Sequence, residues 1–91
     1  MTTDPASPGE TEGPATETQE KVARIWAEVL KKDTFGVNDD FFAIGGNSMT
    51  ATLATYQVRE EFEIELPLMA IFEDSTVVAL AKRIDELVAG G

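Results

Sequence analysis

The group of this chain that is best placed for chemistry is a serine hydroxyl at the predicted start of a helix. Residues 44–50 read IGGNSMT, so two glycines and an asparagine precede Ser48 and a helical pattern follows it. A serine nucleophile needs a general base, and the chain contains neither histidine nor cysteine. The remaining bases all lie in polar stretches where an amine stays protonated: Lys21, Lys31, Lys32 and Lys82. We therefore expect no autonomous catalysis at Ser48.

Other kinds of site fit this region no better. The polar residues before the glycines do not follow the ligand spacing of an EF-hand: Asp33, Asn38, Asp39 and Asp40. Without histidine and cysteine, the usual zinc and copper ligand sets are missing. Two glycines with no lysine after them are too short for a phosphate-binding loop. Taken alone, Ser48 is most simply interpreted as a helix N-cap, a role that contributes about 1 kcal/mol.

Size and charge restrict the classes of partner. With 91 residues, the chain is one small domain at most. Its formal net charge of −10 opposes binding to a phosphate backbone, so no nucleic-acid partner is expected. No stretch approaches the length of a membrane span, and no secretion signal precedes the domain. We expect a soluble, cytoplasmic monomer that has no membrane partner.

The elements that must position Ser48 are predicted to be helices. Residues 1–15 hold three prolines and three acids but almost no apolar side chain, which predicts a disordered acidic leader before a domain at residues 16–89. Helical periodicity predicts an all-α, four-helix bundle with three main helices and one short one, over residues 17–31, 48–61, 67–72 and 76–88. Thr16 and Gln19 fit a capping box, and Pro67 suits the first turn of the short helix.

Apolar side chains indicate how these helices pack. The first helix carries one stripe: Val22, Ile25, Trp26, Val29 and Leu30. The last helix carries another: Val77, Leu80, Ala81, Ile84, Leu87 and Val88. The long loop between the first two helices, residues 32–47, is expected to be held down by its own side chains: Phe35, Val37, Phe41, Phe42 and Ile44.

Three motifs occur in order between Asp39 and Leu80: DDFFAIGGNSM, LPLMAIF and TVVAL. This ordered set resembles the peptidyl carrier proteins, which are the thiolation domains of nonribosomal peptide synthetases and belong to the acyl-carrier-protein superfamily. The family pattern is D-x-F-F-x-L-G-G-x-S-L, then L-P-L-x-x-(I/L)-F, then T-V-x-x-L. Asn47 stands where relatives usually have histidine or aspartate, and it suits the same turn.

The resemblance implies a non-catalytic carrier. A separate phosphopantetheinyl transferase would attach 4′-phosphopantetheine from coenzyme A to Ser48, with Gly45, Gly46 and Asn47 as the flanking loop. The thiol of this arm would hold an aminoacyl or peptidyl group as a thioester. An adenylating enzyme would load it, and condensation or tailoring enzymes would use it in natural-product biosynthesis. The transferase would also supply the general base and the magnesium ion that the attachment reaction needs.

The second helix has two apolar faces. By size alone, Met49, Leu53 and Tyr56 should face the core. The resemblance implies the opposite orientation, with Ala51, Ala54 and Val58 buried. An outward docking surface would then include Met49, Thr52, Leu53 and Tyr56, and Met69 on the short helix would extend it.

The type of carrier follows from the same helix. Fatty-acid synthase carriers usually have acids along it, whereas this chain has none between Ser48 and Arg59. That difference favours a peptidyl carrier, with an acyl carrier protein of a polyketide pathway as the nearest alternative. A helical interaction module, in which Ser48 is only a cap, is the alternative from a different class. Because the chain begins with methionine and ends soon after the last helix, we expect a free-standing carrier.

Overall fold

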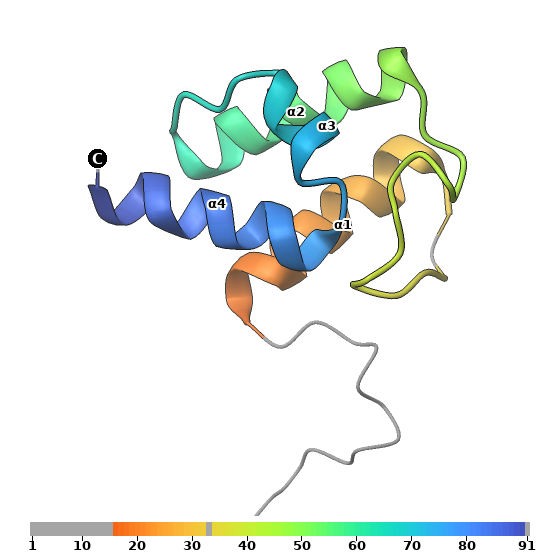
Figure 1. Cartoon of the computed structure of the whole chain (residues 1–91), viewed down its shortest axis with the longest axis horizontal. Helices are drawn as coiled ribbons and strands as arrows, with labels where there is room; N and C mark the ends of the chain where they lie inside the picture. Colours follow the sequence, from red (N-terminus) through yellow and green to blue (C-terminus); the bar gives the residue numbers. More distant parts are fainter. Residues whose placement is uncertain (1–15, 33, 91) are drawn as a thin grey trace, which may run out of the picture.

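The computed structural model of the protein describes residues 16–32 and 34–90, which form four helices and no strand. Helix α1 spans Glu17–Leu30, α2 spans Ser48–Phe62, α3 spans Met69–Glu73 and α4 spans Val77–Gly90. Figure 1 shows α3 as a short helix between the two long ones that flank it in sequence, and a long loop that leads from α1 into α2. The predicted all-α architecture is confirmed. The predicted leader, residues 1–15, lies outside the described residues.

Local interactions set where the long helices begin and end. Thr16 Oγ1 accepts a hydrogen bond from the Gln19 N–H at 3.1 Å, which caps α1 as predicted. At the other end, Lys31 adopts the left-handed conformation with φ 55°, and its N–H donates to Ala27 O. Glu63 ends α2 in the same way, with φ 54° and an N–H donated to Arg59 O. Helices α1 and α2 therefore end within one residue of their predicted boundaries, whereas α4 continues to Gly90, two residues beyond its predicted end.

The short helix begins later than predicted. Pro67 lies just before α3 rather than in its first turn, and its carbonyl accepts the N–H of Ala70 at 3.0 Å. Helix α4 begins directly after Thr76, whose Oγ1 accepts the N–H of Ala79 at 3.1 Å. The connection between α3 and α4 is thus a tight, capped turn.

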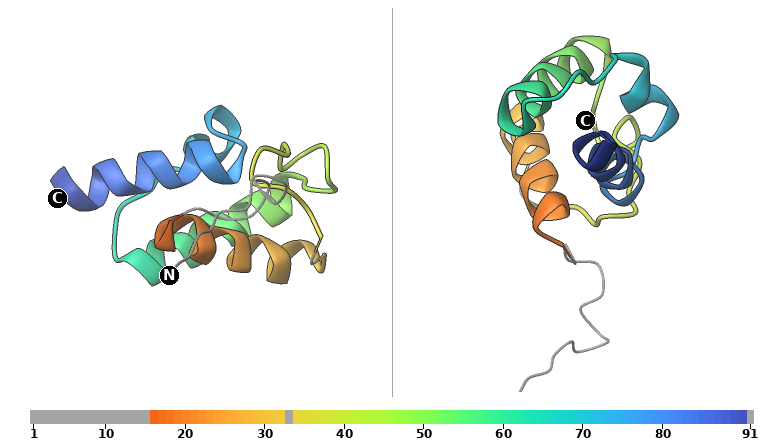
Figure 2. Two further views of the ribbon diagram at one scale, coloured as in Figure 1. Left: turned by 90° about the horizontal axis from the view of Figure 1, so that it is seen from below. Right: turned by 90° about the vertical axis from the view of Figure 1, so that its left-hand side faces the viewer.

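The core lies between α1, α2 and α4 and is closed by the loop before α2. Helix α1 packs against both α2 and α4, as the end-on view in Figure 2 shows. Trp26 and Phe41 are fully buried and meet edge to face, with ring centroids 4.8 Å apart. The five loop side chains predicted to hold the loop down are buried or packed against the core: Phe35, Val37, Phe41, Phe42 and Ile44.

One member of the predicted α4 stripe is an exception. Val77, Leu80, Ala81 and Ile84 are buried, whereas Val88 is 51% exposed. It lies in the last turn of α4, where the other helices no longer cover it. Within the described ranges, no helix is both long and apolar enough to cross a membrane.

Candidate phosphopantetheine attachment site

Ser48 is the first residue of α2, and it is not the residue that caps the helix. The N-cap is Asn47, whose Oδ1 accepts the N–H of Thr50 at 3.0 Å. In return, Thr50 Oγ1 accepts the N–H of Asn47 at 2.8 Å. This reciprocal pair is a capping box, and it caps the helix without the Ser48 side chain. The interpretation of Ser48 as an N-cap is therefore wrong.

Capping by Asn47 leaves the Ser48 hydroxyl free. The side chain of Ser48 is exposed, and Oγ makes no hydrogen bond with any described residue. The other serine in the described ranges, Ser75, donates its hydroxyl to Asp40. The sequence marks Asn47 as a turn-compatible residue, and the N-x-x-T spacing could also have identified its capping role.

The two glycines before Ser48 serve different purposes. Gly45 has φ 117°, and a Cβ atom added to it would meet nothing within 4 Å. Gly46 lies against Phe41: an added Cβ would fall 2.6 Å from the Phe41 carbonyl oxygen and closer still to its ring. Gly45 therefore leaves the approach to Ser48 free of a side chain, whereas Gly46 permits close packing of the loop on the core.

A polar contact holds this loop to the turn between α3 and α4. Asp40 accepts hydrogen bonds from the Ser75 hydroxyl and from the N–H groups of Phe42 and Ala43, the last two at 2.9 and 3.1 Å. The Phe41 N–H donates to Ser75 O at 2.7 Å. The bond from Ser75 is the main reason that the pKa of Asp40 lies below its ordinary value; burial opposes this effect, and the two N–H groups add to it.

Helix α2 turns its small residues inward. Its buried residues are Ala51, Ala54, Thr55 and Val58, whereas Met49, Leu53 and Tyr56 are exposed. The orientation expected from side-chain size alone is therefore wrong, and the one implied by the resemblance is found. Small side chains at the contact let two helix backbones approach closely.

An apolar surface consequently adjoins the free hydroxyl. A hollow of about 430 Å³ is lined by Ser48, Met49, Thr52 and Leu53. Met49 is 75% exposed, and Met69 on α3 is 58% exposed. We name the exposed residues predicted for docking the docking stripe: Met49, Thr52, Leu53, Tyr56 and Met69. Leu68 and Phe72 are also exposed near Met69, although their sequence pattern does not single them out.

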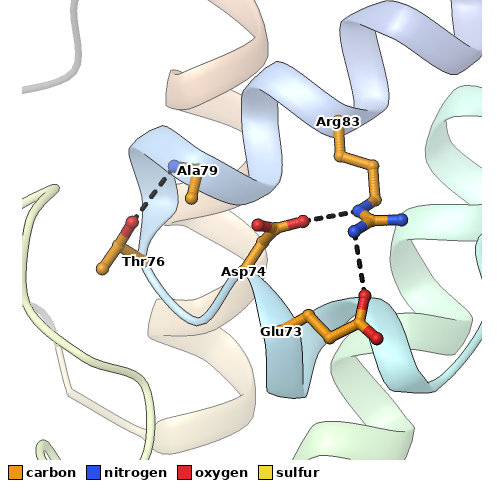
Figure 3. Close-up of polar contacts among 5 residues, drawn as sticks. All are labelled: Glu73, Asp74, Thr76, Ala79 and Arg83. Carbon is orange, nitrogen blue, oxygen red and sulfur yellow. Dashed lines mark hydrogen bonds and ion pairs between the residues drawn. The ribbon is translucent and has the colours of Figure 1, made fainter.

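One arginine makes polar contacts between α3 and α4. Arg83 on α4 donates from Nε to Asp74 Oδ2 at 2.5 Å and from Nη2 to Glu73 Oε1 at 3.0 Å, as Figure 3 shows. The hydrogen bond to Asp74 is the main cause of the raised pKa of Arg83. Both carboxylates belong to the end of α3, so Arg83 ties this helix to α4.

The described residues supply no catalytic partner for Ser48. No lysine among them makes a hydrogen bond to the serine, and Lys21 lies 3.8 Å from Glu17 and 3.5 Å from Glu61 in two ion pairs. Within the same ranges, no group of histidine, cysteine, aspartate and glutamate residues could hold a metal ion. The site thus presents a nucleophile and a surface but no base.

A family model described as "Phosphopantetheine attachment site" matches residues 20–84. The chain belongs to this family. The match takes in all of α2 and α3 and most of α1 and α4, so the carrier domain as a whole, and not a single motif, carries the assignment.

Individual relatives agree with the family model. The carrier domain is 47% identical over 66 residues to a linear gramicidin synthase of Brevibacillus parabrevis, a match that covers 72% of this chain and 1% of the synthase. The carrier domain therefore spans a very small part of that relative's length. Its fold matches a peptidyl carrier protein solved with the phosphopantetheine transferase Sfp and coenzyme A, at 36% identity and a TM-score of 0.78, over 81% of this chain and 96% of that one.

A further solved structure, McyG A-PCP complexed with phenylalanyl-adenylate, matches at 29% identity and a TM-score of 0.78, over 84% of this chain and 12% of that one. Together these matches identify a phosphopantetheine-bearing peptidyl carrier related to the thiolation domains of nonribosomal peptide synthetases. By its family, it is a carrier domain with a phosphopantetheine attachment site.

The start of α2 fits such a group. A phosphodiester on Ser48 Oγ would lie beside the N–H groups of Ser48 and Met49, which have no hydrogen-bond partner among the described residues. The first turn of α2 contains no acid that would repel the phosphate. Anions at a helix N-terminus are stabilised by about 0.3–1 kcal/mol when the site is exposed.

Proposed function

We propose that Ser48 is the residue to which 4′-phosphopantetheine is attached. The observation that supports this most directly is the hydroxyl itself, which is exposed, makes no hydrogen bond in the described part of the chain and has no capping role. Ser75 is a poor candidate because its hydroxyl is donated to Asp40 within the turn that holds the loop.

The proposed attachment needs little from the carrier beyond this hydroxyl. Ser48 Oγ forms a bond to the phosphorus next to the pantetheine of coenzyme A, the pyrophosphate bond of coenzyme A breaks, and the nucleotide part leaves. The serine proton passes to a base of the transferase, since the carrier offers none near Ser48. The carrier contributes an exposed nucleophile at a helix end whose dipole favours the attached phosphate.

We also propose that the docking stripe is where partner enzymes bind. Three of these residues line the hollow beside Ser48, namely Met49, Thr52 and Leu53, and four of the five are large apolar or aromatic side chains left in solvent. A methionine-rich apolar surface can adapt to several partners in turn. The expected partners are the transferase, an adenylating enzyme that loads the thiol, and condensation or tailoring enzymes that use the aminoacyl or peptidyl thioester.

Mass spectrometry tests the attachment. Incubation with coenzyme A, magnesium and a transferase of the Sfp type should raise the intact mass by one phosphopantetheine group. Ser48→Ala should abolish this rise, whereas Asn47→Asp, which keeps a capping side chain, should retain it. An unmodified wild-type protein that is shown by circular dichroism to be folded would rule out the proposed function.

A second measurement, on the modified protein, identifies the group that the carrier holds as a thioester. Aminoacyl adenylates, supplied by a set of adenylating enzymes, should transfer to the new thiol and add the mass of one amino acid. If a malonyl group transferred and no amino acid did, the carrier would be of the polyketide type.

A further inference from the structure

A second groove lies at the end of the bundle away from Ser48. It has a volume of about 450 Å³ and is lined by six residues, which we call the end groove: Phe62, Glu63, Ile64, Glu65, Leu87 and Val88. In Figures 1 and 2, the last turns of α2 and α4 lie at the same end of the molecule, whereas α2 begins at the other end. Since α2 has 15 residues, its two ends are about 20 Å apart. The end groove is thus separate from the docking stripe.

The apolar part of the end groove comes from two segments of the chain. Phe62, Ile64 and Leu87 are partly buried and pack against the core, so they form a fixed floor. Val88 is 51% exposed at the side of this floor. An apolar floor of this kind can accommodate one or two apolar side chains of another protein.

The rim of the end groove is acidic. Glu63 and Glu65 line it, and residues 85–90 contain two acids and no base. Lys21 lies over Phe62, 5.6 Å from the ring centroid, but its charge is offset by the ion pairs with Glu17 and Glu61. Neither Glu63 nor Glu65 forms an ion pair among the described residues. The last turn of α4 also lacks a basic residue, so the free carbonyl groups of the helix end add to the negative potential.

The negative charge of the rim excludes three possible occupants of the end groove. The segment 1–15 contains three acids, no base and no large apolar residue apart from Met1, so the rim would repel it and the floor would gain nothing from it. A second copy of the chain would bring the same acidic rim against itself. An anionic lipid surface is repelled for the same reason.

We propose that the end groove is a docking site for a basic segment of a partner protein, with one or two large apolar side chains on the floor and lysine or arginine side chains against Glu63 and Glu65. A partner held here leaves the Ser48 end free. The carrier could therefore stay attached to one protein while a second enzyme acts at Ser48. This inference concerns the opposite end of the bundle and does not depend on modification of Ser48.

Nuclear magnetic resonance tests the site with three short synthetic peptides of equal length. The first carries leucine and tryptophan on one helical face and lysine and arginine on the other. The second replaces the basic residues with glutamate, and the third replaces the apolar residues with serine. The first peptide should shift the backbone amide signals of residues 62–65 and 87–88 but not those of residues 48–53, whereas the other two should shift neither set.

Two variants localise the contact. The lysine introduced by Val88→Lys repels a basic peptide. It also interacts favourably with the negative end of the α4 dipole, so we expect the fold to be retained. Glu65→Lys reverses one charge of the rim. Each should weaken binding of the first peptide by at least about tenfold, and the affinity of the wild type should fall with added salt. Glu28→Lys, at an exposed position of α1 that belongs to neither surface, makes the same change of charge as Glu65→Lys and is the matched control; it should leave the affinity nearly unchanged.

Three results would overturn the proposal. One is that the serine-substituted basic peptide binds as well as the first, since this would reduce the interaction to net charge. Another is that Glu28→Lys weakens binding as much as Glu65→Lys does, since the effect would then come from net charge and not from the end groove. The third is that the signals of residues 62–65 and 87–88 shift with protein concentration alone, because a second copy would then cover the end groove.

Discussion

Gly46 and Phe41 are in such close contact that no side chain fits between them. A Cβ atom at position 46 would lie 2.6 Å from the carbonyl oxygen of Phe41, and the Gly46 N–H donates to that same oxygen at 2.9 Å. Phe41 is fully buried and also contacts Trp26. The loop that delivers Ser48 is therefore fastened to the centre of the core one residue before the helix cap.

Substitution of the two glycines should separate packing from backbone conformation. We expect Gly46→Ala to destabilise the protein by about 1–3 kcal/mol, because the buried Phe41 must move. Gly45→Ala has open space around the new methyl group and should cost about 1 kcal/mol for its positive φ alone. Urea unfolding followed by circular dichroism measures both values. Equal losses would show that Phe41 yields to the added methyl group without cost.

Substitutions of Asn47 and Ser48 at the start of α2 should have separate effects on the stability of the fold and on the modification. Asn47→Ala removes the capping side chain, so it should cost about 1 kcal/mol while the mass gain on incubation with transferase and coenzyme A persists. Ser48→Ala should do the reverse, with modification lost and the free energy of unfolding within about 0.5 kcal/mol of the wild type. A large loss of stability in Ser48→Ala would contradict the assignment of the cap to Asn47.

The two faces of α2 should respond in opposite ways to substitution. Leu53 is 49% exposed, so Leu53→Asp should keep the helical signal while it slows loading by partner enzymes. Ala54 is fully buried, and Ala54→Leu should destabilise the fold by about 1–3 kcal/mol through overpacking. Circular dichroism and the rate of phosphopantetheine transfer report the two effects. Unfolding of Leu53→Asp would place this side chain in the core instead.

Removal of Arg83 should loosen α3. Arg83→Gln breaks the contacts to Glu73 and Asp74, and its expected cost in global stability is about 0.2–1 kcal/mol because the pairs are partly exposed. The effect should be concentrated in faster amide hydrogen exchange of residues 69–73. Lys82→Gln, at an exposed neighbouring position, is the matched control. If exchange in α3 is the same in both variants, Arg83 does not hold the helix.

Acid should weaken the attachment of the loop. The pKa of Asp40 is lower in the folded than in the unfolded protein, so its contribution to stability is fully present above the ordinary value of 3.8 and is lost as the pH falls through the lower folded value. Asp40→Asn should therefore be less stable than the wild type at neutral pH, and the difference should shrink in acid. Ser75→Ala removes the main cause and should raise the pKa of Asp40, as measured by carbon NMR of the carboxyl group. An unchanged pKa would show that the Ser75 bond is absent in solution.

The helices could be predicted from the sequence because their patterns are local. The stripe on α1 and the Thr16 cap are readable from spacings of three and four residues, and they place the helix within one residue of its observed end. Val88 was misplaced because a stripe does not reveal where the neighbouring helices stop covering it. Pro67 was placed inside α3 because proline favours a first turn but does not require one.

The sequence could place Ser48 at the start of a helix, but it could not show which residue caps that helix. Ser48 stood out by its motif, yet periodicity alone assigned the wrong face of α2 to the core, since it weighs side-chain size and ignores how closely two helices approach. Arg83 and Asp74 are 9 positions apart in the sequence, and Asp40 and Ser75 are 35 positions apart. Such pairs depend on tertiary packing and leave no signal in a helical pattern.

The capping box formed by Asn47 and Thr50 has a consequence for protein turnover. Because the Ser48 hydroxyl makes no hydrogen bond at the helix start, its modification removes no interaction from the fold, and the attached phosphate stabilises the helix by only about 0.3–1 kcal/mol. The apo chain should therefore open at most a few times more readily than the modified chain. Proteases that degrade transiently opened proteins would then degrade the unmodified carrier only a few times faster than the modified one. A pool of unmodified carrier should therefore persist until a transferase reaches it.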